Sequence, residues 1–382
     1  MCKTVGFISL ADPFKDKNAW SGTIYKLREA IEMAGFRVIW IPFRKNALSV
    51  LIAKSLRKIE IALRSTKILG DVYYKPIAWS YSKTIDKKAV SLCDYIFIPQ
   101  NAPLALFIKT KGVLIYLSDA TIKQFDGYYW RALPPKSLKR ATRLEEEGLQ
   151  RFDIIIMSSQ WAIDSVINDY YCIPEKCHLL EFGYNLNTKD IVPSKPYCGG
   201  TLNILFSGVD WIRKNGKCAI DTVKELRNMG LNALLLVAGP KECPKEVEEC
   251  EFVVYTGFLD KSNVQDYEKY ITLYKQSHVF ILPTKAECAG TVLCEATAFG
   301  IPCYTYNTGG LQNYVINDYN GYAFPTSCTA KDFAHKIYDD YVNDKFQIYH
   351  TNSLKLSKQK LSWEVWALKF SNLLMENTKE MF

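Results

Sequence analysis

The sequence lacks the features that mark several large classes of protein. No run approaches the roughly 20 uninterrupted apolar residues that a membrane-spanning helix needs. The 12 cysteines include no C-x-x-C pair and no tight cluster with histidine, so we expect no zinc site and interpret them as reduced thiols. A nicotinamide-dependent oxidoreductase would need G-x-G-x-x-G after the first strand, but residues 11–18 contain no glycine.

What is present indicates a globular protein of more than one domain. The chain has 382 residues, of which 48% are apolar, and this length is ordinary for two domains. The first ten residues are typical of a first strand and not of a cleavable signal. Together with the scattered thiols, this predicts a cytoplasmic protein.

Positive charge is concentrated in the first part of the chain. Residues 1–150 hold 25 Lys and Arg against 13 Asp and Glu, a balance of +12. The totals of 48 and 40 leave 23 against 27 for the remainder, a balance of −4. Residues 44–67 carry seven cations and one anion among aliphatic residues. Such a basic amphipathic helix can lie on an anionic membrane, here the inner face, although a core helix with a lysine-rich outer face is an equal alternative. No motif supports a nucleic-acid partner.

Short apolar runs alternate with helical patterns, which predicts parallel strands buried on both faces. The expected fold class is α/β, with two doubly wound Rossmann-like domains facing across a cleft. We expect a first domain over residues 1–192, a linker at 193–200, a second domain at 201–360, and a last helix at 361–382 that returns to the first domain. Strands are expected at the following positions: residues 5–10, 37–41, 95–99, 113–117, 154–157, 178–181, 203–206, 233–238, 252–255, 279–282 and 302–306.

Two glutamates bracket the most informative of these turns. Glu287 follows the expected strand at 279–282, and Glu295 lies eight residues later, about one turn into the next expected helix. The amides of Gly290 and Thr291 would begin that helix and could hold a phosphate through its N-terminal dipole. A surface pair of glutamates is the alternative interpretation.

The motifs around this pair resemble those of the family 4 glycosyltransferases of the GT-B fold. The resemblance rests on Glu-Ala-x-Ala-x-Gly-x-Pro at 295–302, Thr-Gly-Gly at 308–310, Asn-Gly at 320–321, a Gly-to-Lys-x-Gly loop at 208–216, and Ser-Trp-Glu at 362–364. Members of that family are retaining enzymes that use nucleotide-diphosphate sugars. The resemblance therefore implies a hexosyltransferase that acts on a glycan or lipid-linked acceptor in polysaccharide or glycolipid synthesis.

The resemblance also assigns roles to residues of the second domain. Lys214 and Arg213, next to Gly208, would stabilise the departing diphosphate, because a guanidinium offers two donors to phosphate oxygens. Glu295 would bind the ribose hydroxyls, and Glu287 would contact the transferred sugar. No Asp-x-Asp motif occurs, so neither a metal nor a cofactor is expected beyond the donor substrate.

In the first domain, Gly22 and Thr23 would begin the first helix close to the donor phosphates, whereas Ser21 as an ordinary N-cap is the alternative. Asp119 could orient the acceptor hydroxyl or accept its proton, or it could cap a helix.

Three departures from the family pattern stand out. Val209 replaces an arginine, Asn313 replaces an acidic residue, and the first domain lacks a histidine near the reacting sugar. These departures keep one alternative open, which is a non-catalytic sugar-nucleotide-binding scaffold at a membrane.

Overall fold

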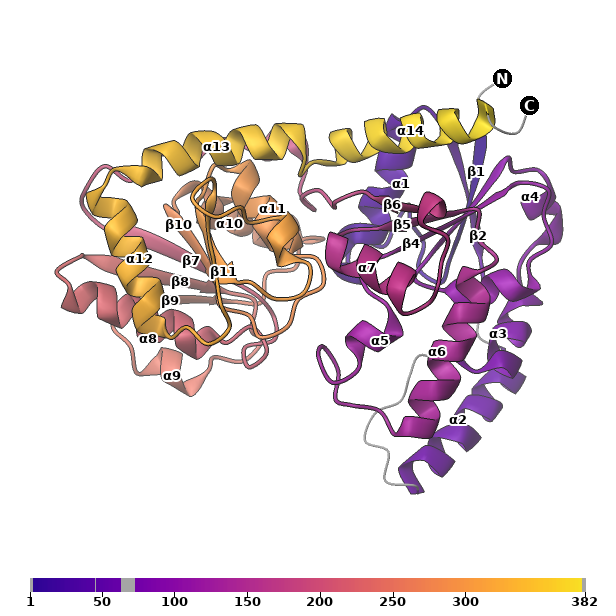
Figure 1. Cartoon of the computed structure of the whole chain (residues 1–382). Coiled ribbons are helices and arrows are strands. Elements are labelled where there is room, and N and C mark those ends of the chain that lie inside the picture. Colours follow the sequence, from indigo (N-terminus) through magenta and orange to yellow (C-terminus); the bar gives the residue numbers. More distant parts are fainter. Residues whose placement is uncertain (1–2, 45, 63–72, 380–382) are drawn as a thin grey trace. The chain divides into compact units, whose positions relative to one another are not determined.

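The computed structural model describes residues 3–44, 46–62 and 73–379. The chain forms two compact units (Figure 1): unit 1 comprises Met1–Leu180 with Ala367–Phe382, and unit 2 comprises Glu181–Trp366. The change from unit 1 to unit 2 therefore occurs before the expected linker at 193–200, which lies inside unit 2. Across the described ranges, no helix combines the length and the apolar content that crossing a bilayer requires.

Unit 1 is built on a six-stranded sheet in the order β2-β1-β3-β4-β5-β6, and its paired strands run parallel. The strands are β1 (Thr4–Ser9), β2 (Arg37–Pro42), β3 (Tyr95–Pro99), β4 (Val113–Ser118), β5 (Ile154–Met157) and β6 (Cys177–Leu179). Both β3 and β5 are buried along their whole length, as their unbroken apolar sequences predict.

The helices of unit 1 are α1 (Thr23–Met33), α2 (Ala47–Ala62), α3 (Lys75–Ser82), α4 (Lys87–Ser91), α5 (Ile122–Phe125), α6 (Pro135–Leu149), α7 (Gln160–Asn168) and the later part of α14 (Trp363–Lys379). The predicted basic helix corresponds to α2, while Lys45 and residues 63–67 of that stretch lie outside the described residues. Phe370 of α14 packs edge-on against Phe36 and Phe97 of unit 1.

Unit 2 repeats this plan with a second six-stranded parallel sheet, in the order β12-β11-β10-β7-β8-β9. Its strands are β7 (Leu202–Ser207), β8 (Ala233–Ala238), β9 (Val253–Gly257), β10 (Val279–Leu282), β11 (Cys303–Tyr306) and β12 (Gly321–Phe324). The strand β12 was not among the expected strands, although Asn320 and Gly321 belong to a motif identified in the sequence: residues 321–324 pair in register with β11.

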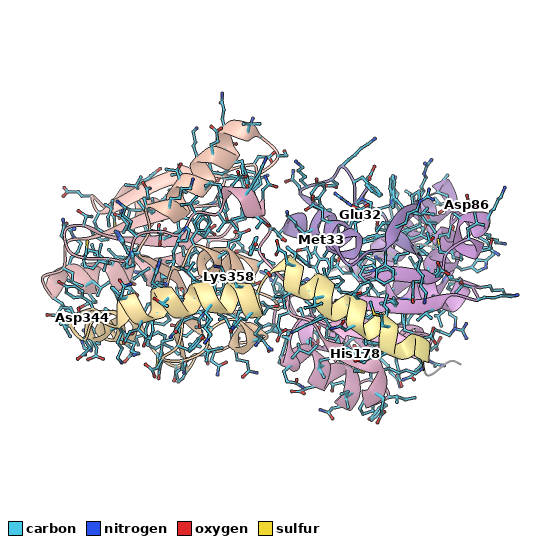
Figure 2. The ribbon with its side chains drawn as sticks, turned by 90° about the horizontal axis from the view of Figure 1, so that it is seen from above. Glu32, Met33, Asp86, His178, Asp344 and Lys358 are labelled. Carbon is cyan, nitrogen blue, oxygen red and sulfur yellow. The ribbon has the colours of Figure 1, made fainter. Side chains whose placement is uncertain are left out.

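The helices of unit 2 are α8 (Gly216–Asn228), α9 (Lys245–Glu248), α10 (Val264–Lys275), α11 (Thr291–Ala298), α12 (Ala330–Val342), α13 (Lys345–Gln359) and the first turn of α14. Figure 2 shows α13 from above, with Asp344 and Lys358 near its two ends. Asn263 begins α10 as an N-cap, because its side chain accepts hydrogen bonds from the next two amides after Val264. The predicted class, two doubly wound parallel α/β sheets, is confirmed.

The strand order fixes where each sheet is expected to present a ligand. In unit 2, the chain starts at β7 and places β8 on one side and β10 on the other, so the order reverses between β7 and β10. Ligands of doubly wound sheets bind at the carboxyl ends of strands that flank such a reversal. The loops after β7 and β10 are the two loops that carry Lys214 and Glu287.

Candidate functional site

The loop after β7 carries the predicted cations. Gly208 follows the strand directly, and the chain then turns over residues 211–215. Asp210 holds this turn, because its Oδ1 accepts a hydrogen bond from the Arg213 amide at 3.0 Å. Its carbonyl accepts a second bond from the Lys214 amide at 2.9 Å. The turn therefore presents both cations at the carboxyl end of β7.

The loop after β10 packs directly on this turn. The amide of Lys285 donates to the carbonyl of Arg213 at 2.9 Å. On the other side, the amide of Gly310 donates to the carbonyl of Glu287 at 3.3 Å. The backbone of Glu287 is thus held between the β7 loop and the Thr-Gly-Gly segment that the sequence singled out.

The side chains of the two loops meet at one carboxylate oxygen. Lys214 Nζ pairs with Glu287 Oε2, and Arg213 Nη1 lies 3.5 Å from the same oxygen. Arg213 Nη1 also donates to the carbonyl of Ala286 at 2.7 Å. Lys214 is 8% exposed and Glu287 7% exposed. Arg213 Nε also lies 3.5 Å from Asp210 Oδ2, so two cations and two carboxylates balance in this cluster. Lys214 and Glu287 lie in a place with little access to water, where charge interactions are strong.

Two glycines bring the backbone close together beneath this cluster. Gly239, at the end of β8, has a φ of +120°, and a Cβ there would lie 2.5 Å from the carbonyl carbon of Gly208. A Cβ on Gly208 would lie 3.0 Å from Cγ of Lys214. The lysine side chain therefore lies directly against a strand end that has no side chain of its own.

Glu295 lies in α11, about one turn from its start as predicted, but it has no exposed surface. Its Oε2 accepts hydrogen bonds from the hydroxyls of Tyr270 at 2.7 Å and Tyr274 at 3.1 Å. Its Oε1 accepts one from Lys261 Nζ at 2.5 Å. The carboxylate is thus enclosed by three donors, whereas the ribose-binding role expected from the sequence requires a carboxylate that a ligand can reach.

The two tyrosines are fixed donors in this arrangement. Burial, followed by the charge of Glu295, raises the pKa of Tyr270 well above its usual value. Burial likewise raises the pKa of Tyr274, to which the neighbouring Tyr270 and Glu295 add. Both phenols therefore keep their protons across the physiological range. Lys261 is the partner that reaches the surface, because 24% of its side chain is exposed and its Nζ lies 4.8 Å from the centre of the Tyr270 ring.

The start of α11 differs from the expected anion site in one respect. The amide of Thr291 already donates to the carbonyl of Ala289 at 2.9 Å. Gly290 has a packing reason for its missing side chain, since a Cβ would lie 2.7 Å from Leu293 and 2.9 Å from Leu311. A phosphate that bound the Thr291 amide would have to replace the bond to Ala289.

The carboxylate that is missing at Asn313 is supplied by another residue of unit 2. Asn313 Nδ2 donates to Oε1 of the buried Glu181 at 3.3 Å. Lys360 Nζ lies 3.2 Å from the same oxygen and also donates to the Asn313 carbonyl at 3.1 Å. Replacement of an acid by Asn313 therefore leaves a buried carboxylate at this position.

The loop after β1 in unit 1 has an unusual backbone. Trp20, Ser21 and Gly22 follow one another with φ of 51°, 56° and 92°, all in the left-handed region. L-residues adopt this region at a cost of about 1–2 kcal/mol each. The N-cap of α1 is Gly22, so the alternative in which Ser21 caps the helix was wrong. Thr23, the first residue of α1, is buried.

Asp119 lies just after β4, and its Oδ2 accepts a hydrogen bond from Trp20 Nε1 at 3.3 Å. This bond links the loop after β4 to residues 20–22, which have left-handed backbone conformations. Asp119 does not cap the next helix: Thr121 caps α5 in a capping box with Gln124, so that alternative was wrong.

A buried glutamate holds the segment that follows Asp119. Glu145 of α6 accepts hydrogen bonds at Oε2 from the Ile122 amide, at 2.9 Å, and at Oε1 from the Tyr73 hydroxyl, at 3.4 Å. The Tyr170 hydroxyl donates to it as well. Burial is the main cause that raises the pKa of Glu145 to about 7, against the effect of these donors.

The sequence did not identify Lys261, Tyr270 and Tyr274 as site residues. The tyrosines lie four residues apart on a helix that was predicted, so one signal was available: they face the same way. Which neighbour they face is set by the tertiary packing of α10 on α11.

Comparison with known proteins identifies what the region around this site is similar to. Residues 195–348 match the family model described as glycosyl transferases group 1. The capsular polysaccharide biosynthesis glycosyltransferase CapM of Staphylococcus aureus is 27% identical over 164 residues, which are 41% of this chain and 43% of that relative.

Three solved structures share the fold over nearly their whole length. A glycosyltransferase from Rickettsia africae has a TM-score of 0.68 at 14% identity, with 98% of each chain covered. Sucrose-phosphate synthase from Thermosynechococcus elongatus has a TM-score of 0.69 at 17% identity, covering 99% of this chain and 100% of that one. Alr3699/HepE of Anabaena, in complex with UDP and glucose, has a TM-score of 0.63 at 13% identity and coverage of 98% and 99%. The chain thus has the GT-B fold of these glycosyltransferases, and its residues 195–348 are similar to the group 1 glycosyl transferases.

Proposed function

We propose that the chain is a retaining glycosyltransferase of family 4. It transfers a hexosyl group from a nucleotide-diphosphate sugar to a hydroxyl of a glycan or lipid-linked acceptor, in the cytoplasm. The product belongs to a cell-surface polysaccharide or glycolipid, as the relation to CapM suggests. The observation that carries the proposal is the meeting of Lys214, Arg213 and Glu287 at the strand reversal of a group 1 domain.

The cluster suits the charge that develops in such a reaction. As the bond to the anomeric carbon breaks, negative charge accumulates on the diphosphate and positive charge on the sugar. Lys214 and Arg213 provide the cations for the diphosphate, because both already share one carboxylate and both are held by the turn at Asp210. Glu287 then turns from its cations to the hydroxyls of the sugar.

Glu295 provides acceptors for the ribose hydroxyls in this scheme. Its Oε2 stays with Tyr270 and Tyr274, since both tyrosines are buried. Its Oε1 faces the partly exposed Lys261, so the ribose replaces or joins that lysine. Lys261 is then free to move toward the diphosphate. The amides of Gly290 and Thr291 contribute only if the bond to Ala289 opens.

In the proposal, residues of unit 1 contact a donor phosphate and the acceptor hydroxyl. Gly22 closes the run of three left-handed residues that begins at Trp20, and the Thr23 amide donates to the Trp20 carbonyl, so a phosphate that bound the Thr23 amide would have to replace this bond. Asp119 orients the acceptor hydroxyl from the end of β4. The leaving phosphate takes the acceptor proton in this scheme, so the histidine that the family carries is not required.

One experiment tests both the activity and its stereochemistry. Purified protein is incubated with a panel of nucleotide-diphosphate sugars, and NMR records nucleotide release and the anomeric configuration of the product. We expect one donor to turn over with its configuration kept, and Lys214→Ala to lower turnover by about 100- to 1,000-fold. An inverted product would refute the retaining mechanism. Tight donor binding without release, in the presence of acceptor lipids, would favour the membrane scaffold.

A separate measurement tests whether the reaction requires a metal ion. We expect turnover to be unchanged after dialysis against a chelator, because the cations at the diphosphate are side chains. Loss of activity that Mg²⁺ or Mn²⁺ restores would show that a metal shares the role of Lys214 and Arg213.

A further inference from the structure

Unit 1 has a basic outer surface that the transfer reaction does not use. It is formed by α2, α3 and α6, which Figure 1 shows close together in unit 1. Lys75 of α3 pairs with Glu147 of α6 at 2.8 Å, and Arg140 of α6 lies over the ring of Tyr74, 4.2 Å from its centre. We call the exposed side of these three helices the basic face.

The cations of the basic face recur at helical spacing. On α6, Lys136, Lys139, Arg140 and Arg143 are all exposed and lie at positions i, i+3, i+4 and i+7. On α2, Leu51, Lys54, Ser55 and Lys58 are exposed at the same spacing. Residues at this spacing share one side of a helix. Each helix therefore presents a continuous stripe, which is purely cationic on α6 and mixed on α2.

The order of charges along α6 runs against the helix dipole. Residues 131–143 hold five cations and no acid, whereas residues 145–147 are three glutamates. A helix dipole favours acids at the amino end and cations at the carboxyl end, by about 0.3–1 kcal/mol each. Arg143 pairs with Glu147 at 3.1 Å, but the dipole does not account for Lys136, Lys139 and Arg140.

Apolar side chains are exposed on the same helices. Leu51 of α2 is 63% exposed and Trp79 of α3 is 46% exposed. Lys83 Nζ lies 5.1 Å from the centre of the Trp79 ring. Tryptophan beside lysine is typical of surfaces at the level of lipid headgroups, where the ring meets the acyl boundary and the cation meets phosphate. Ile52 packs inward on the core, so α2 is also anchored in unit 1.

We propose that the basic face binds the surface of an anionic lipid bilayer. The partner follows from charge complementarity combined with exposed Leu51 and Trp79, since a nucleic acid could use the cations and stack on Trp79 but would leave Leu51 exposed. Every charged residue of α6 from Pro135 to Leu144 is a cation, and Lys54 and Lys58 extend the positive charge onto α2. Bilayer binding would bring the proposed enzyme to lipid-linked acceptors, although it does not depend on sugar transfer.

The test measures sedimentation of the full chain with lipid vesicles. We expect binding to vesicles that contain phosphatidylglycerol, increasing with its fraction, and little binding to phosphatidylcholine alone. The variant K54Q/K58Q/K136Q/K139Q should bind at least about tenfold more weakly, since each lysine near the surface contributes about fivefold. The matched control K224Q/K331Q/K355Q/K358Q removes four exposed lysines from unit 2 and should bind like the wild type.

Two outcomes would overturn the proposal. One is equal weakening in both quadruple variants, which would indicate net charge and not the basic face. The other is binding to single-stranded RNA at concentrations that leave anionic vesicles unbound. Circular dichroism and nucleotide binding should be the same in all variants. Weaker vesicle binding could then not be attributed to misfolding. As a second measurement, brominated lipids should quench the tryptophan fluorescence of the wild type more strongly than that of Trp79→Phe.

Discussion

Tyr270 donates its hydroxyl hydrogen to Glu295 Oε2 at 2.7 Å, in a place where Glu295 has no contact with solvent. Tyr274 reinforces the same oxygen from the next turn of α10. This relationship joins α10 to α11 and leaves Oε1 to Lys261, which is partly exposed, so a ligand would reach the carboxylate by displacing Lys261. Binding and packing therefore depend on two different oxygens of one side chain.

We expect Glu295→Ala to destabilise unit 2 by about 3–5 kcal/mol, because Lys261 and two tyrosines lose a buried acceptor. Glu295→Gln keeps an oxygen for the tyrosines and should cost less, while donor affinity falls in both. Urea unfolding and calorimetric titration with the donor measure the two effects. Tyr274→Phe is the control, with a cost of about 1 kcal/mol and unchanged donor affinity. Unchanged donor affinity in Glu295→Gln would contradict the ribose assignment.

Lys214→Ala is expected to lower kcat by about 100- to 1,000-fold, the loss seen when one preorganised donor to a developing charge is removed. Affinity for the nucleoside diphosphate product should fall as well. The control is Lys217→Ala, which removes an exposed lysine of α8 that pairs with Asp221. Steady-state kinetics of both variants measure the change in kcat. A similar loss in both variants would mean that local charge, and not the position of Lys214, matters.

The two glycines beneath the cluster should respond differently to alanine. Gly208→Ala meets only the flexible side chain of Lys214, so activity should fall with little change in stability. Gly239→Ala meets backbone at 2.5 Å with a φ of +120° and should cost about 2 kcal/mol or more. Gly230→Ala, where φ is +92° and nothing lies within 4 Å, isolates the backbone strain. Chemical denaturation gives the free energies of unfolding, and equal costs at Gly230 and Gly239 would refute the close contact.

Glu145 should make unit 1 less stable as pH rises. Its pKa is raised from 4.5 to about 7 in the folded chain, so the folded state binds more protons than the unfolded state between these values. The stabilisation is fully present below pH 4.5 and is lost as pH passes 7, a change of about 3 kcal/mol. The difference in unfolding free energy between wild type and Glu145→Gln should therefore change between pH 5 and pH 8. A constant difference would show that Glu145 does not titrate there.

The sequence predicted strands well where the apolar runs are unbroken. The bounds of β3, β5, β8 and β10 were predicted to the residue, since each is a buried run with a clear end. The strand β12 was missed because Asn320 and Gly321 are typical turn residues, and Gly321 in fact has a φ of +143°. Pairing with β11, a tertiary effect, makes residues 321–324 a strand.

The site was predictable in its positions but not in its contacts. Loop positions after β7 and β10 placed Lys214 and Glu287 near each other, because parallel strands end at one edge of a sheet. Their direct ion pair, and the enclosure of Glu295 by Tyr270 and Tyr274, depend on side-chain packing between separate elements. Spacing along a sequence does not contain that information.

The charge order of α6 implies that helix stability and the bilayer binding we propose favour opposite charges at the same positions. Lys136 lies in the first turn of the helix, so Lys136→Glu should stabilise unit 1 by up to about 1 kcal/mol. The same substitution would remove a cation from the basic face and weaken the bilayer binding that we propose. Selection for heat resistance alone would therefore be expected to remove these cations, at the expense of that proposed binding.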